Sequence, residues 1–355
     1  MTRPLHPLPV LTLDLDADGV LLHPVSGRRV KDKELPHVIR TTLDLPAAVT
    51  DVVVFVHGWL TSREKALRGT ERLLALAEGG WAARAGRYPA LPRHTRVQCV
   101  ALRWRSVSLY RRARDRTRGN TLEGHAGHVV AALLGYLDEW REPPRPDTAD
   151  TLPRAGGQYV HAVGHSFGCR FLCQAVPESG PAELSRRPVD VLAPVHEDER
   201  YAYTVDSLLL LQMAAPPRVL AAGGAYGRLF TDAPVSGPVA VTHTRHDRAT
   251  GLWHRLREGE RGIGTVGLPG PAAVEVHRTT LRAPERAYAD GELHHRLVDV
   301  DATEVFRRGR WKPTGAHSDI WYPHTAHLLL SLMNDAHEAA RTGGLPANGP
   351  NGPVR

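Results

Sequence analysis

Residues 159–170 read Tyr159-Val160-His161-Ala162-Val163-Gly164-His165-Ser166-Phe167-Gly168-Cys169-Arg170, an apolar strand-like run that contains Gly-x-Ser-x-Gly and leads into a helix-like segment. A serine at such a junction lies on a tight strand-to-helix turn, because glycine two residues to either side lets the backbone pass close by. The turn pushes the hydroxyl group of Ser166 out of the predicted sheet. Helical spacing of apolar residues follows, at Phe171, Leu172, Ala175 and Val176. The stretch predicts a nucleophile elbow; the alternative is a core turn with an inert serine.

Residues 51–59 form a second apolar run, Val52-Val53-Val54-Phe55-Val56, followed by His57-Gly58-Trp59. A continuous apolar run of this length is typical of a strand buried on both faces, as in a parallel sheet. Thr61 and Glu64 then fit a capping box, and apolar residues continue a helix to about Ala85.

Further strands are predicted at residues 97–104, 206–214, 238–244 and 295–305, and further helices at 122–140 and 324–340. Strands that alternate with helices predict an α/β fold with a mostly parallel central sheet flanked by helices. Leu11 to Leu22, with a turn at Asp18-Gly19, predicts a short N-terminal β-hairpin. We expect a single domain over residues 1–340, in which residues 1–50 are a β-rich extension, and a disordered Gly/Pro/Asn-rich tail over 341–355.

Composition limits the class of protein. The chain has 355 residues, and 42% of them are hydrophobic, which is ample for a packed core. No segment has the length of a membrane span, and the first ten residues lack the apolar stretch and cleavage site of a secretion signal. We therefore expect a cytoplasmic protein. Three cysteines, Cys99, Cys169 and Cys173, form an odd set without disulfide spacing, so we expect buried thiols.

The formal net charge of +7 comes from a composition rich in arginine. The densest cluster is Arg103, Arg105, Arg111, Arg112, Arg114, Arg116 and Arg118, with Trp104 and Tyr110 among them. It could bind phosphate-rich partners, but a solvated basic face is the simpler interpretation. Because no helix-turn-helix, zinc-finger or RNA-binding signature is present, we expect no specific nucleic-acid partner.

With these motifs in place, the chain resembles the α/β-hydrolases over roughly residues 50 to 335. The resemblance lies in His57-Gly58 after one buried strand, Gly164-His165-Ser166-Phe167-Gly168 after a later one, Asp247 after a strand, and His317 near the C-terminal end. The order Ser, Asp, His is that of the family. Residues 103–137 are also similar to an uncharacterised bacterial branch whose pattern is Trp-Pro-Ser, where this chain has Trp104-Arg105-Ser106.

The resemblance implies acyl transfer to water. Ser166 would attack a carbonyl carbon, His317 would act as the base, and Asp247 would orient the imidazole. The backbone N–H groups of Phe167 and Trp59 would hold the oxyanion. Three other aspartates fit the acid position less well: Asp206 opens a strand and should lie at the opposite edge, Asp232 falls in an unassigned segment, and Asp319 is too near His317.

Several groups also suggest metal ligands. Asp14, Asp16, Asp18 and Gly19 resemble the start of a calcium loop, but Val25 stands where a bidentate glutamate is needed. Short-spaced histidines occur at His125 and His128, His243 and His246, His294 and His295, and His324 and His327, without a zinc motif. We expect no metal and no cofactor.

The predicted function is therefore a serine hydrolase that cleaves an acyl ester of a small or medium substrate, since no long apolar lid is evident. The alternatives are a thioesterase, amidase or peptidase on the same scaffold, or a catalytically silent binding protein. Residues 189–203 and 216–238 are candidates for a cap or pocket wall near the strand ends.

Overall fold

A computed structural model describes residues 8–46, 48–108, 112, 114, 125–140, 158–178, 205–230 and 235–342. Residues 141–157, the candidate pocket-wall segment 189–203 and most of the C-terminal tail lie outside the described residues. The described residues contain one sheet in the order β2-β1-β4-β3-β5-β6-β7-β9-β8. Its strands are β1 (Leu11–Leu15), β2 (Leu21–Leu22), β3 (Asp51–Val56), β4 (Val97–Arg103), β5 (Tyr159–His165), β6 (Ser207–Leu211), β7 (Val239–His243), β8 (Val276–Thr280) and β9 (Leu297–Asp301).

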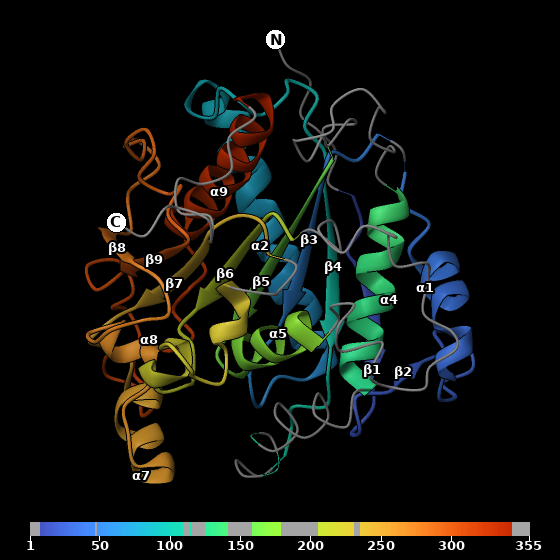
Figure 1. Cartoon of the computed structure of the whole chain (residues 1–355), viewed down its shortest axis with the longest axis horizontal. Coiled ribbons are helices and arrows are strands. Elements are labelled where there is room, and N and C mark those ends of the chain that lie inside the picture. The colour runs from blue at the N-terminus through green and yellow to red at the C-terminus, as the bar shows by residue number, and fades with distance from the viewer. Residues whose placement is uncertain are drawn as a thin grey trace.

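The sheet is parallel throughout except at the β1–β2 hairpin. Helices cover both of its faces (Figure 1). One face carries α1 (Leu35–Leu43), α4 (His125–Trp140) and α5 (Phe167–Glu178), and the other carries α2 (Arg63–Arg84) and α9 (Pro323–Thr342). The predicted α/β class with a mostly parallel, helix-flanked sheet is confirmed.

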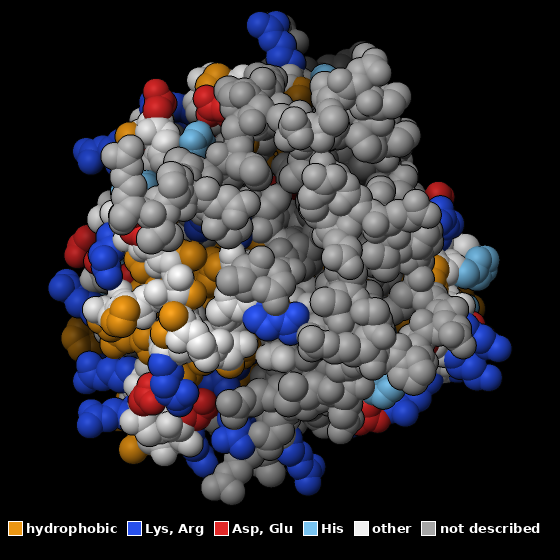
Figure 2. Space-filling model, viewed as in Figure 1, with side chains coloured by type: hydrophobic (Ala, Val, Ile, Leu, Met, Phe, Trp, Pro, Cys, Tyr) orange, Lys and Arg blue, Asp and Glu red, His pale blue; other side chains and the backbone are white. Residues whose placement is uncertain are grey.

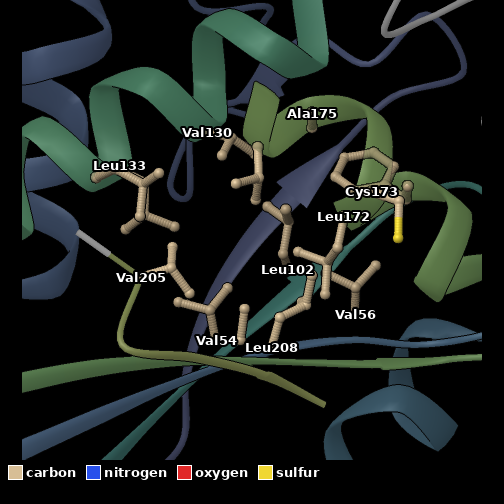
Figure 3. Close-up of a cluster of buried hydrophobic side chains, with 14 of the residues drawn as sticks. Val54, Val56, Leu102, Val130, Leu133, Leu172, Cys173, Ala175, Val205 and Leu208 are labelled. Atoms are coloured by element: carbon tan, nitrogen blue, oxygen red, sulfur yellow. The ribbon is translucent and has the colours of Figure 1, made fainter. Parts of the chain in front are cut away.

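The central strand β3 shows how the sequence divides the core. Its side chains alternate between the two faces, because successive residues of a strand point in opposite directions. Val52, Val54 and Val56 belong to the core beneath α4 and α5, whereas Val53 and Phe55 belong to the core beneath α2 and α9. Figure 3 shows the first of these cores, with Val54 and Val56 facing the apolar side chains of α4 and α5. This double burial explains why the strand is a continuous apolar run.

The N-terminal region differs from the expectation in two ways. The β1–β2 hairpin is present, but β1 also pairs in parallel with β4, so it extends the main sheet. In addition, residues 35–43 form the helix α1, whereas the sequence predicted a β-rich extension in this region. The buried residues of α1 recur at helical spacing, at Leu35, Val38, Ile39 and Leu43.

The start of α2 corrects another prediction. The expected capping box at Thr61 and Glu64 is wrong by one residue, because Ser62 is the N-cap. Its hydroxyl oxygen accepts a hydrogen bond from the backbone N–H of Lys65 at 3.3 Å. The edge strand β8 was also not predicted, since none of its residues is fully buried and its sequence has no apolar run.

The three cysteines are free and buried, as expected for thiols that pack in the core. Burial raises the pKa of each thiol above its ordinary value, which disfavours the reactive thiolate. Among the helices of the described residues, none is both long and apolar enough to cross a membrane.

Candidate active site

Ser166 occupies the turn between β5 and α5, at the carboxyl edge of the sheet. Its φ is 57°, a left-handed conformation that costs free energy for a residue with a Cβ atom. Two backbone contacts hold it there: Ser166 N–H donates to the carbonyl oxygen of Leu211 at 3.0 Å, and Ala214 N–H donates to the carbonyl oxygen of Ser166 at 3.3 Å. The turn is thus fixed by the end of the neighbouring strand β6.

The glycines of the motif are required by close packing around this turn. A Cβ atom on Gly168 would lie 2.1 Å from the carbonyl oxygen of Val56, and one on Gly164 would lie 2.8 Å from the backbone nitrogen of Cys169. Both distances are far inside van der Waals contact. The Gly-x-Ser-x-Gly pattern therefore reflects the approach of α5 to β3 and of the turn to its own strand.

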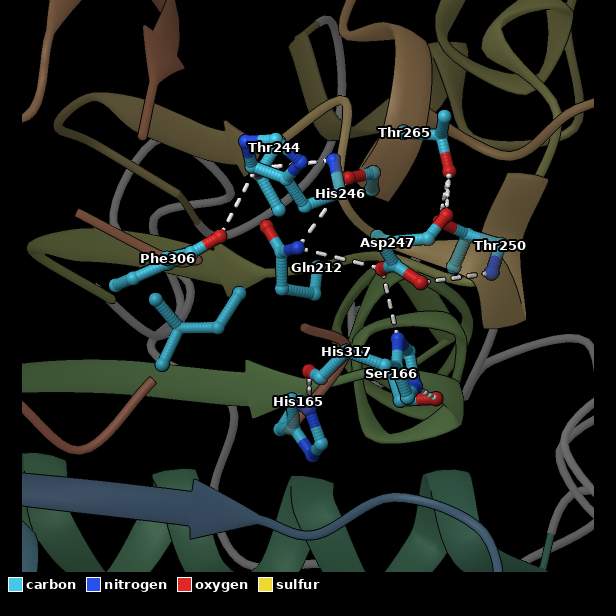
Figure 4. A network of polar contacts seen from close by, with 12 residues as sticks. His165, Ser166, Gln212, Thr244, His246, Asp247, Thr250, Thr265, Phe306 and His317 are labelled. Carbon is cyan, nitrogen blue, oxygen red and sulfur yellow. Dashed lines mark hydrogen bonds and ion pairs between the residues drawn. The ribbon is translucent and has the colours of Figure 1, made fainter. Parts of the chain in front are cut away.

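The structure brings Ser166, His317 and Asp247 together in one chain of hydrogen bonds (Figure 4). The Ser166 hydroxyl lies 2.7 Å from Nε2 of His317, and Nδ1 of His317 lies 2.8 Å from Oδ2 of Asp247. The carboxylate fixes the tautomer, because Nδ1–H donates to it and leaves Nε2 free to accept from the hydroxyl. Ser166 and Asp247 are buried, and the side chain of His317 is 12% exposed.

Asp247 follows β7 in a short turn that satisfies both of its carboxylate oxygens. Oδ1 accepts the backbone N–H of Thr250 at 2.9 Å, while the side-chain amide of Gln212 donates to Oδ2 at 3.3 Å. Its carbonyl oxygen accepts from the hydroxyl of Thr265 at 2.6 Å. Since these donors come from three different segments, the carboxylate is held in one orientation.

Gln212 is a site residue that the sequence interpretation missed. It is fully buried directly after β6 and has a φ of 50°. Its amide also donates to the carbonyl oxygen of Gly264 at 3.3 Å, and its own oxygen accepts from the hydroxyl of Thr242 at 3.3 Å. The available signal was a polar residue immediately after a five-residue apolar strand, where parallel sheets place their ligands and catalytic groups.

The loop of His317 is attached to the loop of Asp247 by backbone contacts. Ala316 N–H donates to the carbonyl oxygen of His246 at 2.9 Å, and Ala249 N–H donates to that of Thr314 at 3.1 Å. Gly315 has a φ of 65°, and a Cβ atom there would lie 2.1 Å from the carbonyl oxygen of His246. A glycine is therefore needed for the close approach of the two loops.

His165, the residue before the serine, supports the same loop. Its Nε2–H donates to the carbonyl oxygen of His317 at 3.0 Å. Burial, followed by the proximity of His317, lowers the pKa of His165 to about 3, so this imidazole is neutral around physiological pH. A neutral ring adds no charge beside His317.

The predicted oxyanion residues, Trp59 and Phe167, contact each other through their rings. Phe167 is the first residue of α5, and Trp59 packs edge-on against its ring at a centroid distance of 6.5 Å. Between them Gly58 approaches the serine so closely that a Cβ atom on it would lie 2.8 Å from Cβ of Ser166. The backbone N–H groups of a first helical turn point toward such a space; that Trp59 and Phe167 hold an oxyanion stays a prediction.

His57 lies in the core and fixes the loop after β3 that contains Gly58 and Trp59. It stacks on Trp104 at a centroid distance of 5.8 Å, and Trp104 Nε1–H donates to its carbonyl oxygen at 2.8 Å. Burial lowers the pKa of His57 to about 4, which keeps the ring neutral. Its Nδ1–H donates to the carbonyl oxygen of Gly58 at 2.9 Å, so His57 fixes the backbone at the glycine.

The rival aspartates do not contact His317 in the described residues. Asp206 lies at the opposite, amino edge of the sheet, as predicted, and accepts the N–H of Val160 at 2.7 Å. Asp319 accepts from the N–H of Arg308 and the hydroxyl of Tyr322, both at 2.7 Å. Asp232 lies outside the described residues.

The other motifs of the sequence are separate from this site. Asp16 and Asp18 pair with Arg29, and Asp14 pairs with Arg103. Among the described residues, one group has metal-ligand spacing, His294 with Asp335 and Glu338, and it includes none of the candidate catalytic residues. Of the arginine cluster, Arg111, Arg116 and Arg118 and the neighbouring Tyr110 lie outside the described residues.

No protein-family model and no curated protein matches the chain.

Proposed function

We propose that this chain is a serine hydrolase of the α/β-hydrolase type that cleaves an acyl ester of a small or medium substrate. The observation that carries the proposal is the unbroken hydrogen-bond chain from Ser166 Oγ through His317 to Asp247, with distances of 2.7 and 2.8 Å. Two further features support it: the left-handed serine at a strand-to-helix turn, and the order Ser, Asp, His along the chain.

In this mechanism Ser166 Oγ attacks the carbonyl carbon of the ester while its proton passes to Nε2 of His317. The tetrahedral oxyanion accepts hydrogen bonds from the N–H groups of Phe167 and Trp59. His317 then donates the proton to the leaving alcohol, and the C–O bond breaks to give an acyl-enzyme. A water molecule, deprotonated by His317, attacks the acyl carbon; the acid leaves, and Ser166 regains its proton.

Asp247 orients the ring of His317 and stabilises its protonated form without itself taking the proton. Thr250 and Gln212 contribute by holding the two carboxylate oxygens, as their hydrogen bonds indicate. The same side chains could cleave a thioester or an amide, and fold analogy does not choose among these bonds. A silent binding protein is disfavoured, because such a protein has no need to keep all three side chains in hydrogen-bonding geometry.

The test is covalent labelling by a fluorophosphonate probe, which reacts with an activated serine. We expect labelling of Ser166, and a large loss of labelling in Ser166→Ala and His317→Ala while far-ultraviolet circular dichroism shows a folded protein. Labelling that persists in folded Ser166→Ala would place the nucleophile elsewhere. A wild-type protein that reacts with no probe would support the silent-binder alternative.

A further inference from the structure

A cavity of about 320 Å³ lies beside the first two turns of α5, the helix that begins directly after Ser166. Its walls come from α5, from residues 215–226, and from the end of α7 (His254–Glu258). This volume is at the lower end of the range for small-molecule sites. Part of the segment predicted to form a pocket wall, at Pro216, Val219 and Tyr226, lines it.

Two hydrogen bonds connect this cavity to the nucleophile. The side chain of Arg170, one turn after Ser166, donates through Nε to the carbonyl oxygen of Ala214. The N–H of Ala214 donates in turn to the carbonyl oxygen of Ser166. The next residue, Ala215, lines the cavity. The wall of the cavity is thus tied to the backbone of Ser166 through Arg170 and Ala214.

The lining is strongly basic. Of the described residues that line the cavity, four are arginines (Arg114, Arg170, Arg218 and Arg257) and one is acidic, Glu258. Figure 2 shows Lys and Arg side chains gathered at the lower left, over the part of the molecule where Figure 1 places α7, with acidic side chains among them. Glu258 pairs with Arg170 and Glu260 pairs with Arg218, so two of these four charges are offset and a smaller positive excess remains among the described residues.

Arg170 and Glu258 form the fixed part of this wall. Arg170 is buried, and its Nη2 contacts both carboxylate oxygens of Glu258, at 2.9 and 2.8 Å. The same nitrogen donates to Nε2 of His254 at 2.9 Å, while Nδ1–H of His254 donates to the carbonyl oxygen of Glu260 at 2.7 Å. Burial lowers the pKa of His254, so the ring stays neutral and accepts from the arginine. Glu258 is thus neutralised within the protein.

Arg218 and Arg257 are better placed to bind a ligand. Arg257 is exposed on α7, and Arg218 pairs with Glu260 at 2.7 Å, with side chains that are 61% and 45% exposed. An ion pair at such exposure contributes little free energy, so an anion can compete with Glu260 for Arg218. Arginine binds carboxylate and phosphate oxygens with two parallel N–H donors.

We propose that this cavity binds an oxyanion group, a carboxylate or a phosphate, carried by the substrate whose ester bond is cleaved at Ser166. The inference rests on the proposed function, and it narrows the substrate class from neutral esters to anionic ones. Arg218 and Arg257 supply the ligand contacts, and the ion pair of Arg170 with Glu258 forms a fixed wall beside them.

The kinetic test uses 4-nitrophenyl esters of one acyl chain that ends in a carboxylate, in a phosphonate of the same length, or in the neutral methyl ester of the carboxylate. The comparison is repeated over a series of acyl-chain lengths, so that the length that best joins Ser166 to the cavity is found by measurement. We expect kcat/KM for one of the anionic esters to exceed that for the matched neutral ester by about tenfold or more, as a charge-assisted contact supplies. The better terminal group identifies the oxyanion.

Charge reversal tests the residues. Arg257→Glu, and the double variant that adds Arg218→Glu, should each lower the ratio of kcat/KM for the anionic ester to kcat/KM for the neutral ester by about tenfold or more. The matched control is Arg255→Glu, since Arg255 is an exposed arginine of the same helix that does not line the cavity. The control should leave the ratio unchanged. Salt should reduce the wild-type preference, because these charges are partly exposed.

Calorimetric titration of Ser166→Ala with glutarate and with inorganic phosphate separates this inference from the proposed function. Binding that Arg257→Glu weakens supports the anion site even if no ester is cleaved. Equal turnover of anionic and neutral esters, with no calorimetric binding, overturns the anion site while leaving the serine hydrolase intact. Failure of the fluorophosphonate probe counts against the hydrolase alone.

Discussion

The side-chain amide of Gln212 donates to Oδ2 of Asp247 at 3.3 Å, the same carboxylate oxygen that Nδ1 of His317 contacts at 2.8 Å. Gln212 therefore acts on the imidazole only through the carboxylate of Asp247. Its side chain is buried, and hydrogen bonds with Thr242 and Gly264 hold it in place. A carboxylate oxygen with two fixed donors has little freedom to rotate, so Gln212 acts as a positioning residue for Asp247.

The first prediction follows from this contact. Gln212→Met keeps the length of the side chain and removes the donor, so we expect kcat to fall about tenfold, the order of one hydrogen bond to a charged group. KM should change little, because Gln212 contacts the carboxylate and no substrate group. The measurement is kcat and KM together with the melting temperature.

Gln98→Met is the matched control for this variant. Gln98 is a second buried glutamine, in β4, whose amide donates to the carbonyl oxygens of Pro9 and Cys99. We expect its replacement to lower the melting temperature without a selective loss of kcat. Equal losses of kcat in the two variants would mean that Gln212 contributes only to stability.

The strands that hold the site could be predicted from the sequence because their signal is local. β3 is a nearly continuous apolar run, β5 is mostly apolar, and Ser166 lies between two glycines at which the packing leaves no room for a Cβ atom. The edge strand β8 has a mixed sequence and is only partly buried, so no local pattern identifies it. The helix α1 does have a helical spacing of apolar residues. It was missed because the hairpin pattern of residues 11–22 favoured β structure for the whole N-terminal region.

The candidate site was predictable only in part, for a similar reason. Ser166, His317 and Asp247 each lie in a segment with its own signal: a glycine-bounded serine, a small-residue loop, and an aspartate after an apolar strand. Gln212 and the cluster of Arg170 with Glu258 have no such local signal. Their roles arise from contacts between residues 35 and 88 positions apart, which only the fold creates.

The second prediction concerns the approach of the loop after β3 to the nucleophile. In Gly58→Ala the new methyl group would lie 2.8 Å from Cβ of Ser166, so either the serine or the loop after β3 has to shift. We expect kcat/KM to fall by about a hundredfold or more, the effect of a lost oxyanion donor.

Gly86→Ala serves as the control, because nothing lies within 4 Å of the corresponding Cβ position. It should retain full turnover and reactivity toward the fluorophosphonate probe. If Gly58→Ala is as active as this control, the loop does not form the oxyanion site.

The third prediction is a pH dependence of stability from the amino edge of the sheet. Asp51 is fully buried, and Oδ1 accepts Nε2–H of His161 at 3.2 Å and Nε2–H of His337 at 3.0 Å. Burial pushes the pKa of Asp51 upward, but the hydrogen bonds from the two histidines outweigh it, and the pKa falls from 3.8 to about 2. A lowered folded-state pKa stabilises the protein above the unfolded value, and this contribution is lost as the pH falls from about 4 to about 2.

Urea unfolding of wild type and Asp51→Asn between pH 2 and pH 6 measures this contribution. We expect a difference in the free energy of unfolding of about 2 kcal/mol at pH 6, shrinking toward pH 2. A difference that is constant across this range would show that the carboxylate charge is not what stabilises the fold here.

The last prediction concerns the acid of the candidate triad. Asp247→Asn keeps the shape of the side chain but removes the charge that faces Nδ1 of His317. The imidazole then loses its charge partner and its preferred tautomer, and turnover should fall by up to about ten-thousandfold. Because Asn can still accept from Thr250 N–H through its oxygen, we expect the melting temperature to change much less than turnover does.

Asp206→Asn and Asp319→Asn are the comparisons, since each aspartate accepts hydrogen bonds elsewhere in the described structure. Asp206 lies at the amino edge of the sheet, where its loss should lower stability and leave kcat nearly unchanged once the protein is folded. Asp319 should behave in the same way. Asp232→Asn completes the set. If Asp247→Asn keeps near-normal turnover, and one of the other variants loses turnover while its melting temperature is unchanged, that other residue is the acid. The contact between Asp247 and His317 would then be only structural.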